Sequence, residues 1–236
     1  MKISKEKKAK VKKQILNSAI ELISDNGYKK TSMSKIAKKA KIGEATIYNY
    51  FPTKEHILYE YYYELQIQTK TILTNTKQFN EFSLKEQLQL LINTQLELLA
   101  NNRTFILEIY EEIFYKTFTH PAMQKGNNEL ILMINELFEI AIEAEEIEPI
   151  AFSNTVLNLG CDYIFGVIYY WIQDDSENFD NTTVMVDKSL ELIYAILQSG
   201  LINKFEDLLN FIIKTHILNN IKPSKKFKKR LFGKQL

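Results

Sequence analysis

The chain is 236 residues long, 45% hydrophobic and 25% charged, with a formal net charge of +1. Its single cysteine, Cys161, excludes an internal disulfide and a zinc site built from cysteines, and the chain lacks a secretory signal and any apolar run of about 18–20 residues that could span a membrane. We therefore expect a cytoplasmic protein with one or two hydrophobic cores.

Apolar residues recur at helical spacing along almost the whole chain, and no segment favours a β-strand. The four prolines fall between the periodic segments, where helices can begin or end. The sequence predicts an all-α fold with helices over residues 8–25, 33–40, 44–50, 54–76, 84–100, 103–118, 122–146, 150–173, 183–199 and 203–221.

Two short helices joined by a tight turn are the most informative of these elements. Thr31 or Ser32 can cap the first, which carries a small apolar face. In the second, Ile47 and Phe51 lie four residues apart and face inward, and Pro52 ends the helix. Its outward face presents Thr, Tyr and Asn side chains, as in a unit that fits the major groove of DNA.

The charge distribution supports the same interpretation. Residues 1–56 carry a net charge of +9 and residues 222–236 carry +7, which leaves −15 for the residues between them. A basic lobe around the two short helices would attract the phosphate backbone, while the acidic body would be kept away from it. The alternative is a solvated, lysine-rich surface.

Over roughly residues 8–58 the chain resembles the N-terminal DNA-binding domain of TetR/AcrR-type bacterial transcriptional regulators. The resemblance rests on Gly27–Tyr28, Thr31–Met33, Ile36–Ala37, Ala40, Thr46–Tyr48, Tyr50–Phe51 and Lys54–Glu55, in register without a gap. It implies a three-helix helix-turn-helix domain over residues 1–53 and a larger helical ligand-binding and dimerisation domain over residues 54–200. It also implies a homodimer on double-stranded operator DNA, a small-molecule effector and no enzymatic activity.

Four positions depart from the family pattern. Lys41 stands where the family usually has a turn glycine, and Gly43 where it often has a capping serine. A lysine in a left-handed turn costs roughly 1 kcal/mol and a glycine cap a few tenths, so the fold tolerates both. Glu44 and Ala45 replace a frequent basic residue and glycine. Glu44 would accept a hydrogen bond from a cytosine amino group or be repelled by phosphate, so the operator need not match those of relatives.

We expect the DNA contacts to come from the two short helices and the start of the next. Thr46 and Asn49 are candidates for base edges, and the Tyr48 hydroxyl and the Lys54 ammonium group for phosphates. The full set of predicted DNA-binding residues is Ser32, Ser34, Lys35, Glu44, Ala45, Thr46, Tyr48, Asn49, Tyr50 and Lys54.

Two later predicted helices carry more apolar residues than a helix needs to bury one face against its own protein. The segment 150–173 is apolar over most of its circumference, and the segment 183–199 shows the same excess. In the resembled family the corresponding helices pair across a two-fold axis as a four-helix bundle, so Ile168 and Leu190 are predicted to lie in a dimer interface. The alternative is that both helices fill an intramolecular core.

The resemblance implies a small-molecule cavity inside the acidic body. Aromatic residues at helical spacing could line it, although such residues often form plain core: Tyr110, Phe114, Phe138, Tyr163, Phe165, Tyr169 and Tyr170. Asn135 and Asp162 fall on otherwise apolar stretches and could orient a ligand, or simply make capping or interface hydrogen bonds. The expected ligand is apolar or aromatic, with a cationic group as one option.

An enzyme is the least favoured class. The three histidines, His56, His120 and His216, are far apart, and the chain has neither a nucleophile turn nor a glycine-rich phosphate loop. The run Asp174–Glu177 could suggest a metal cluster, but it lacks the ligand spacing of a calcium loop and is predicted to be an acidic surface loop. We expect no metal and no cofactor.

Beyond Gly200 the chain departs from the family plan. Apolar residues from Phe205 to Ile217 predict an extra helix, and a basic segment follows Pro223. Residues 201–236 could form a helix packed on the body with a disordered tail, add a contact to the DNA backbone, or touch an anionic membrane.

The sequence thus predicts a dimeric transcriptional regulator, a repressor released from a palindromic operator by an apolar or aromatic ligand. The main alternative is an effector-independent DNA-binding protein that acts through a protein partner or through nucleoid structure.

Overall fold

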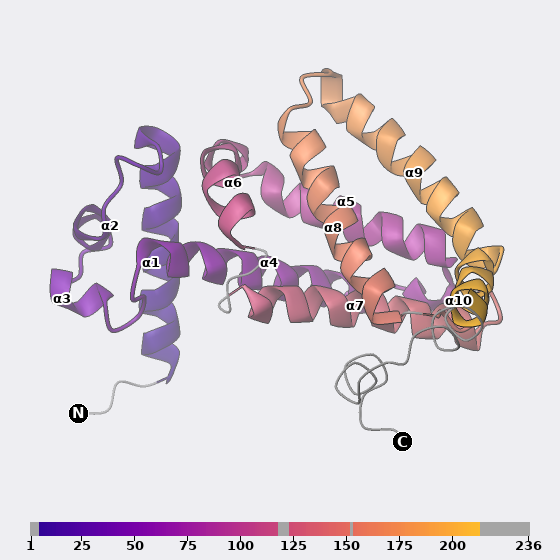
Figure 1. Cartoon of the computed structure of the whole chain (residues 1–236). Helices are drawn as coiled ribbons and strands as arrows, with labels where there is room; N and C mark the ends of the chain where they lie inside the picture. Colours follow the sequence, from indigo (N-terminus) through magenta and orange to yellow (C-terminus); the bar gives the residue numbers. More distant parts are fainter. Residues whose placement is uncertain (1–4, 118–122, 152, 213–236) are drawn as a thin grey trace.

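The computed structural model describes residues 5–117, 123–151 and 153–212, and within them it contains helices and no strand (Figure 1). The all-α prediction is confirmed. The α-helices are α1 (Lys5–Asn26), α2 (Met33–Lys39), α3 (Glu44–Ile47), α4 (Lys54–Asn75), α5 (Leu84–Ala100), α6 (Arg103–Thr117), α7 (Gln124–Glu143), α8 (Ser153–Ile172), α9 (Asp180–Gln198) and α10 (Leu201–Ile212). Two short 3-10 helices, η1 (Phe79–Glu81) and η2 (Glu177–Phe179), precede α5 and α9.

The helices form a small N-terminal head and a larger body. Helices α1–α3 lie together at one end of the molecule, and α4 runs from this head along the body (Figure 1). Within the body α4 packs against α5 and α7, and α8 packs against α7. Helices α8 and α9 form a hairpin on the far side from the head, and α10 packs at the end of α9 (Figure 1).

The predicted helix boundaries differ from the observed ones mainly at α3. We expected this helix to continue to residue 50, but it ends at Ile47, and the N–H groups of Tyr50 and Phe51 both donate to the Ile47 carbonyl. Pro52 has no N–H and keeps Phe51 out of the α conformation, so the helix cannot resume after these turns. The predicted helix 203–221 begins at Leu201, and its part after Ile212 lies outside the described residues.

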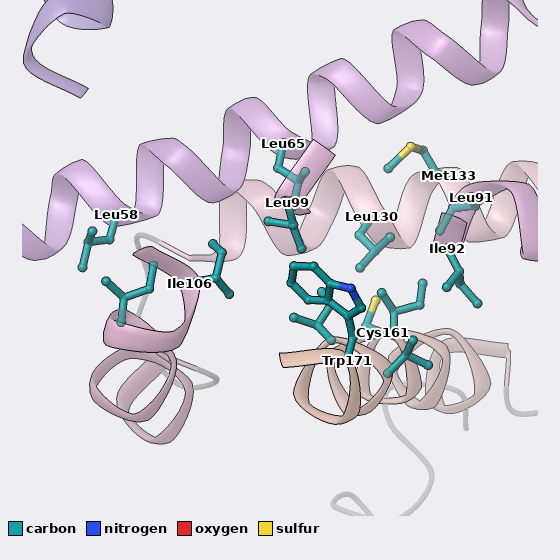
Figure 2. Close-up of a cluster of buried hydrophobic side chains, with 14 of the residues drawn as sticks. Leu58, Leu65, Leu91, Ile92, Leu99, Ile106, Leu130, Met133, Cys161 and Trp171 are labelled. Carbon is teal, nitrogen blue, oxygen red and sulfur yellow. The ribbon is translucent and has the colours of Figure 1, made fainter. Parts of the chain in front are cut away.

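The core of the body is built from one face of each surrounding helix. Figure 2 shows buried side chains of α4, α5, α6, α7 and α8 that face one another, and Trp171, which is 2% exposed, lies among those of α5, α7 and α8. Cys161 is buried in the same cluster, as its apolar surroundings in the sequence suggested, and burial raises the pKa of its thiol to about 12. A thiol held protonated in this way is a packing residue.

Ile168 and Leu190 also belong to this core. They are 6% and 1% exposed within a single chain, so the prediction that they lie in a dimer interface is wrong. Helices α8 and α9 do bury one face in the protomer, as the alternative held. Each nevertheless leaves large apolar side chains on its outer face: Leu159, Tyr169, Tyr170, Val184, Leu192 and Ile196.

Asp174 does not lie on the surface as predicted. Its carboxylate is buried and accepts hydrogen bonds from the backbone and hydroxyl of Ser176 (3.0 and 2.6 Å) and of Thr182 (2.8 and 2.6 Å). These hydrogen bonds hold the pKa of Asp174 well below its usual range. The carboxylate therefore secures the turn into α9, and only Asp175 and Glu177 of the run are exposed.

Candidate nucleic-acid interface and ligand cavity

The turn between α2 and α3 has the geometry that the sequence predicted. Ser32 is the N-cap of α2, and its hydroxyl accepts a hydrogen bond from the backbone N–H of Lys35 (3.3 Å). Lys41 adopts a left-handed conformation with φ of 53°, and Gly43 is the N-cap of α3. Thr31 instead turns inward, where its hydroxyl contacts the carbonyls of Leu22 and Gly27 at 3.1 and 3.0 Å.

The outer face of α3 and of the residues after it is polar and accessible. Ile47 and Phe51 are buried against the head, as expected from their spacing. On this side of α3, Glu44, Ala45, Thr46, Tyr48 and Asn49 are exposed and Tyr50 is half-buried, while Ser32 and Ser34 are exposed at α2. Lys35 is exposed on α2, and its ammonium group donates to the Lys30 carbonyl (2.8 Å).

Lys54 has intramolecular partners that the sequence did not reveal. Its ammonium group donates to the carbonyls of Tyr28 (2.5 Å) and Thr31 (2.8 Å) and lies 3.7 Å from the centre of the Tyr28 ring. The phosphate contact predicted for Lys54 therefore competes with a role in closing the loop between α1 and α2. This loop is fixed from a second side, because the Tyr28 hydroxyl donates to Glu55 (2.7 Å).

The head is tied to the body through the same loop. The Glu108 carboxylate, on α6, accepts a hydrogen bond from the backbone N–H of Tyr28 (3.3 Å). Gly27 has φ of +83°, and a Cβ at this position would come within 3.0 Å of the Glu108 carboxylate. Lys12 of α1 and Glu60 of α4 form an ion pair that adds a second link.

A small apolar cavity of about 80 Å³ lies between α4, α5, α6 and α8. Its walls are almost wholly hydrophobic, and they include Tyr110 and Phe165 from the predicted set. The lining residues are Leu58, Tyr61, Tyr62, Leu65, Leu99, Ile106, Ile109, Tyr110, Met123, Phe165 and Ile168.

The other predicted ligand residues do not line this cavity. The Tyr163 hydroxyl pairs with Ser189 (2.6 Å), Asp162 is exposed, and Tyr169 stacks on Tyr110 with its ring half exposed. Phe138 is buried elsewhere on α7, and Asn135 is half-buried on the same helix. Phe114 falls in a part of α6 whose side chains lie outside the description.

The residues that the sequence reasoning missed are mainly on α4. Tyr61 and Tyr62 lie in a run of three tyrosines, Tyr61–Tyr63, that follows the head directly. This aromatic run is a signal that could have found them, because α4 is the helix that leaves the head and enters the body (Figure 1).

Within residues 5–117, 123–151 and 153–212, no helix is long and apolar enough to cross a membrane. The described side chains also contain no group of three or more His, Cys, Asp or Glu placed to hold a metal ion. Of the three histidines, only His56 falls in this part of the chain, and it contacts the Thr53 hydroxyl (3.0 Å).

Family models match both the head and the body. The model of the tetR family of bacterial regulatory proteins matches residues 15–61, and the model of the tetracyclin repressor-like C-terminal domain matches residues 87–212.

Individual relatives give the same assignment. The chain is 32% identical over 127 residues to the fatty acid metabolism regulator protein of Bacillus subtilis (strain 168), a match that covers 53% of this chain and 59% of the relative. It is 26% identical to the transcriptional regulator FadR from Bacillus subtilis, whose crystal structure is a complex with stearoyl-CoA. The two structures have a TM-score of 0.56, and the match covers 80% of this chain and 98% of the FadR chain. Salmonella enterica GusR shares the fold, with a TM-score of 0.60 and 20% identity over 84% of this chain and 100% of that one.

The two matched models span the helix-turn-helix and most of the body, and both describe regulators of transcription and not enzymes. The chain belongs to the TetR family, and it is a DNA-binding transcriptional regulator.

Proposed function

We propose that the protein is a repressor that binds a palindromic operator as a homodimer and leaves it when an apolar ligand enters the cavity between α4, α5, α6 and α8. The observation that carries this proposal is the position of α6. Ile106, Ile109 and Tyr110 on this helix line the cavity, and Glu108 between them holds the loop of the head at Tyr28. A ligand that moves α6 must therefore also move or release the head.

The head and the body of the fold have different functions in this proposal. Residues 1–53 are the DNA-binding domain, residues 54–200 form the ligand-binding and dimerisation domain, and residues 201–236 are an addition that begins with α10. Support comes from α4, because it begins at Lys54 and is shared between the core of the head and that of the body.

In the DNA-binding domain, α3 enters the major groove. Thr46 and Asn49 reach base edges and the Tyr48 hydroxyl reaches a phosphate, because these exposed side chains lie opposite the buried Ile47 and Phe51. The surface of α2 adds phosphate contacts from Ser32, Ser34 and Lys35. Glu44 lies at the start of α3, where the helix dipole favours its charge, and it selects a cytosine amino group. Tyr50 and Lys54 mainly support the DNA-binding surface from within the head, and their contacts to the DNA backbone are weaker than those of the other residues.

The dimer forms through the outer face of the α8–α9 hairpin. The exposed apolar side chains there include Leu159 and Leu192, which are 60% and 63% exposed in one chain. Several large apolar side chains left exposed on two neighbouring helices favour an interface with another protein surface. Pairing of two copies also doubles the DNA site, which a single short recognition helix requires for specificity.

The ligand is a fatty acyl compound such as an acyl-CoA. Support comes from the relatives, one named as a fatty acid metabolism regulator and one bound to stearoyl-CoA, and from the almost wholly apolar cavity wall. The cavity of about 80 Å³ is far below the roughly 300–1,000 Å³ of occupied ligand pockets. In this proposal the cavity widens when the ligand enters, and a shift of α6 makes room for the acyl chain.

The proposal is tested with operator DNA selected from random duplexes by the full-length protein. The selected sequences should contain a two-fold symmetric site with half-sites about one helical turn apart, or a multiple of it. Addition of acyl-CoAs of increasing chain length should then release the protein in a length-dependent manner, while free coenzyme A should not. Specific binding that no acyl-CoA weakens would favour the effector-independent alternative, and selection of a site without symmetry would contradict the dimer.

A further inference from the structure

Three buried polar atoms beside the cavity have no hydrogen-bond partner. They are the Tyr62 hydroxyl, the Gln66 side-chain nitrogen Nε2 and the Gln95 side-chain oxygen Oε1. Gln66 and Gln95 are 0% and 1% exposed, and their other amide atoms are joined, because Gln95 Nε2 donates to Gln66 Oε1 (2.9 Å). Buried polar groups are nearly always paired, because an unpaired one has lost its hydrogen bonds to water without replacing them.

The spacing of the three residues along α4 and α5 relates the glutamine pair to the cavity. Tyr62 lines the cavity itself, and Gln66 follows one helical turn further along α4. On α5, Gln95 lies one turn from the cavity residue Leu99, and the glutamine pair joins the two helices. An opening that lengthens the cavity between α4 and α5 would therefore reach the pair.

The three atoms have a definite hydrogen-bonding capacity. Burial raises the pKa of Tyr62 well above its ordinary value, so its hydroxyl keeps its proton and can donate. Gln66 Nε2 is a second donor, and Gln95 Oε1 is an acceptor. A hydroxyl group on a ligand accepts up to two hydrogen bonds and donates one, which complements this set.

We propose that Tyr62, Gln66 and Gln95 form the polar inner end of the effector site and bind an uncharged hydroxyl group carried at the far end of an apolar chain. The inference rests on the proposed function and names the ligand class more narrowly, as a hydroxylated acyl compound. A carboxylate or ammonium group is excluded at this position, because none of the three side chains is charged and an unpaired buried ion is far more costly than a neutral group.

The test compares two acids that differ at one group. Undecanoic acid and 10-hydroxydecanoic acid have chains of the same length, with a methyl group in the first where the second has a hydroxyl. Calorimetric titration of the full-length protein should show that the hydroxy acid binds about three- to tenfold more tightly, in line with one or two net hydrogen bonds. Tyr62→Phe should reduce this preference severalfold and leave undecanoic acid binding unchanged or tighter.

Tyr63→Phe is the matched control, since it removes a hydroxyl from the next residue of α4, which lies outside the cavity lining. It should keep the wild-type preference. Without ligand, Tyr62→Phe should raise the melting temperature by about 2–4 °C, because it removes an unpaired buried hydroxyl. A lower melting temperature would mean that the hydroxyl already has a partner, such as a resident water molecule, and would overturn the inference.

The remaining outcomes separate the two proposals. Equal binding of the two acids by the wild-type protein would overturn the hydroxyl site and leave the apolar effector site standing. Binding of neither acid would overturn the hydroxyl site, whereas the apolar effector site is overturned only if acyl-CoAs also fail to bind. If Tyr62→Phe folds poorly, the double variant Gln66→Met and Gln95→Met replaces it, and this variant should lose the same preference.

Discussion

The Glu108 carboxylate accepts a hydrogen bond from the backbone N–H of Tyr28, and this contact joins the cavity-lining helix α6 to the loop that precedes α2. The bond is exposed on the α6 side, so by itself it contributes little stability. Under the proposed function its importance lies in its position, because it connects the cavity-lining helix to the DNA-binding head. Coupling between sites requires such a physical element with two arrangements.

Replacing Glu108 with alanine should uncouple the ligand from the DNA. Operator affinity without ligand should stay within about twofold of the wild type, because no DNA-facing side chain changes. The acyl-CoA concentration that releases half of the operator should rise several-fold, for a coupling loss of about 0.5–2 kcal/mol. Operator binding titrated with acyl-CoA measures both quantities. Glu139→Ala removes another exposed carboxylate, on α7, and should change neither.

Asn49→Ala should relax base specificity. If Asn49 reads a base, its loss should cost about 1–3 kcal/mol at one symmetric pair of operator positions and much less on random DNA. Binding to operator variants substituted at single positions measures this pattern. A uniform loss on every sequence would show that Asn49 contacts only the backbone.

Lys54→Met should lower the melting temperature of the protein and leave the salt dependence of DNA binding nearly unchanged. The ammonium group donates to two carbonyls of the loop between α1 and α2, and its removal leaves both without that donor. A charge-assisted hydrogen bond contributes about 1.5–3 kcal/mol, so a clear fall in melting temperature is expected. An unchanged melting temperature together with a flatter salt slope would instead restore the phosphate contact.

Leu192→Glu and Leu190→Glu should fail in different ways. Leu192 is 63% exposed on the outer face of α9, so a charge there should give a folded monomer that no longer binds operator tightly. Leu190 is 1% exposed in the protomer, so a charge there should unfold the body. Light scattering and circular dichroism distinguish the two results. A dimeric Leu192→Glu protein would place the interface elsewhere.

The head should lose stability in acid through Glu55. Burial alone would raise the pKa of this carboxyl, but hydrogen bonds from Thr53 and Tyr28 outweigh it and lower the pKa to about 2. A group with a lowered folded-state pKa stabilises the fold fully above its unfolded pKa of about 4.3, and this contribution is lost as the pH falls toward 2. Melting temperatures between pH 6 and pH 2 should therefore fall less steeply for Tyr28→Phe than for the wild type.

The head could be predicted from sequence in detail because its determinants are local. Ser32 caps α2 through a residue three positions away, and Ile47 and Phe51 define the buried face of α3 by their spacing alone. The end of α3 at Ile47 could not be predicted from Pro52, because a proline restricts only the residue that precedes it.

The apolar cavity and the exposed apolar face of α8 and α9 could not be predicted in the same way. The cavity depends on which faces of four helices converge, and a pattern such as Tyr61–Tyr63 does not specify the partner helices. Leu190 and Leu192 are chemically alike and two residues apart on one helix. Only the packing of α9 on the body decides that the first is core and the second is surface.

The small cavity would also limit the affinity of the proposed ligand. If an acyl chain needs more room than about 80 Å³, only the fraction of the protein with a wider cavity would bind it, and the observed dissociation constant would be the intrinsic one divided by that fraction. Every chain in a homologous series carries the same penalty. Ile109→Ala, which enlarges the cavity from the α6 side, should therefore tighten the binding of long and short chains by a common factor.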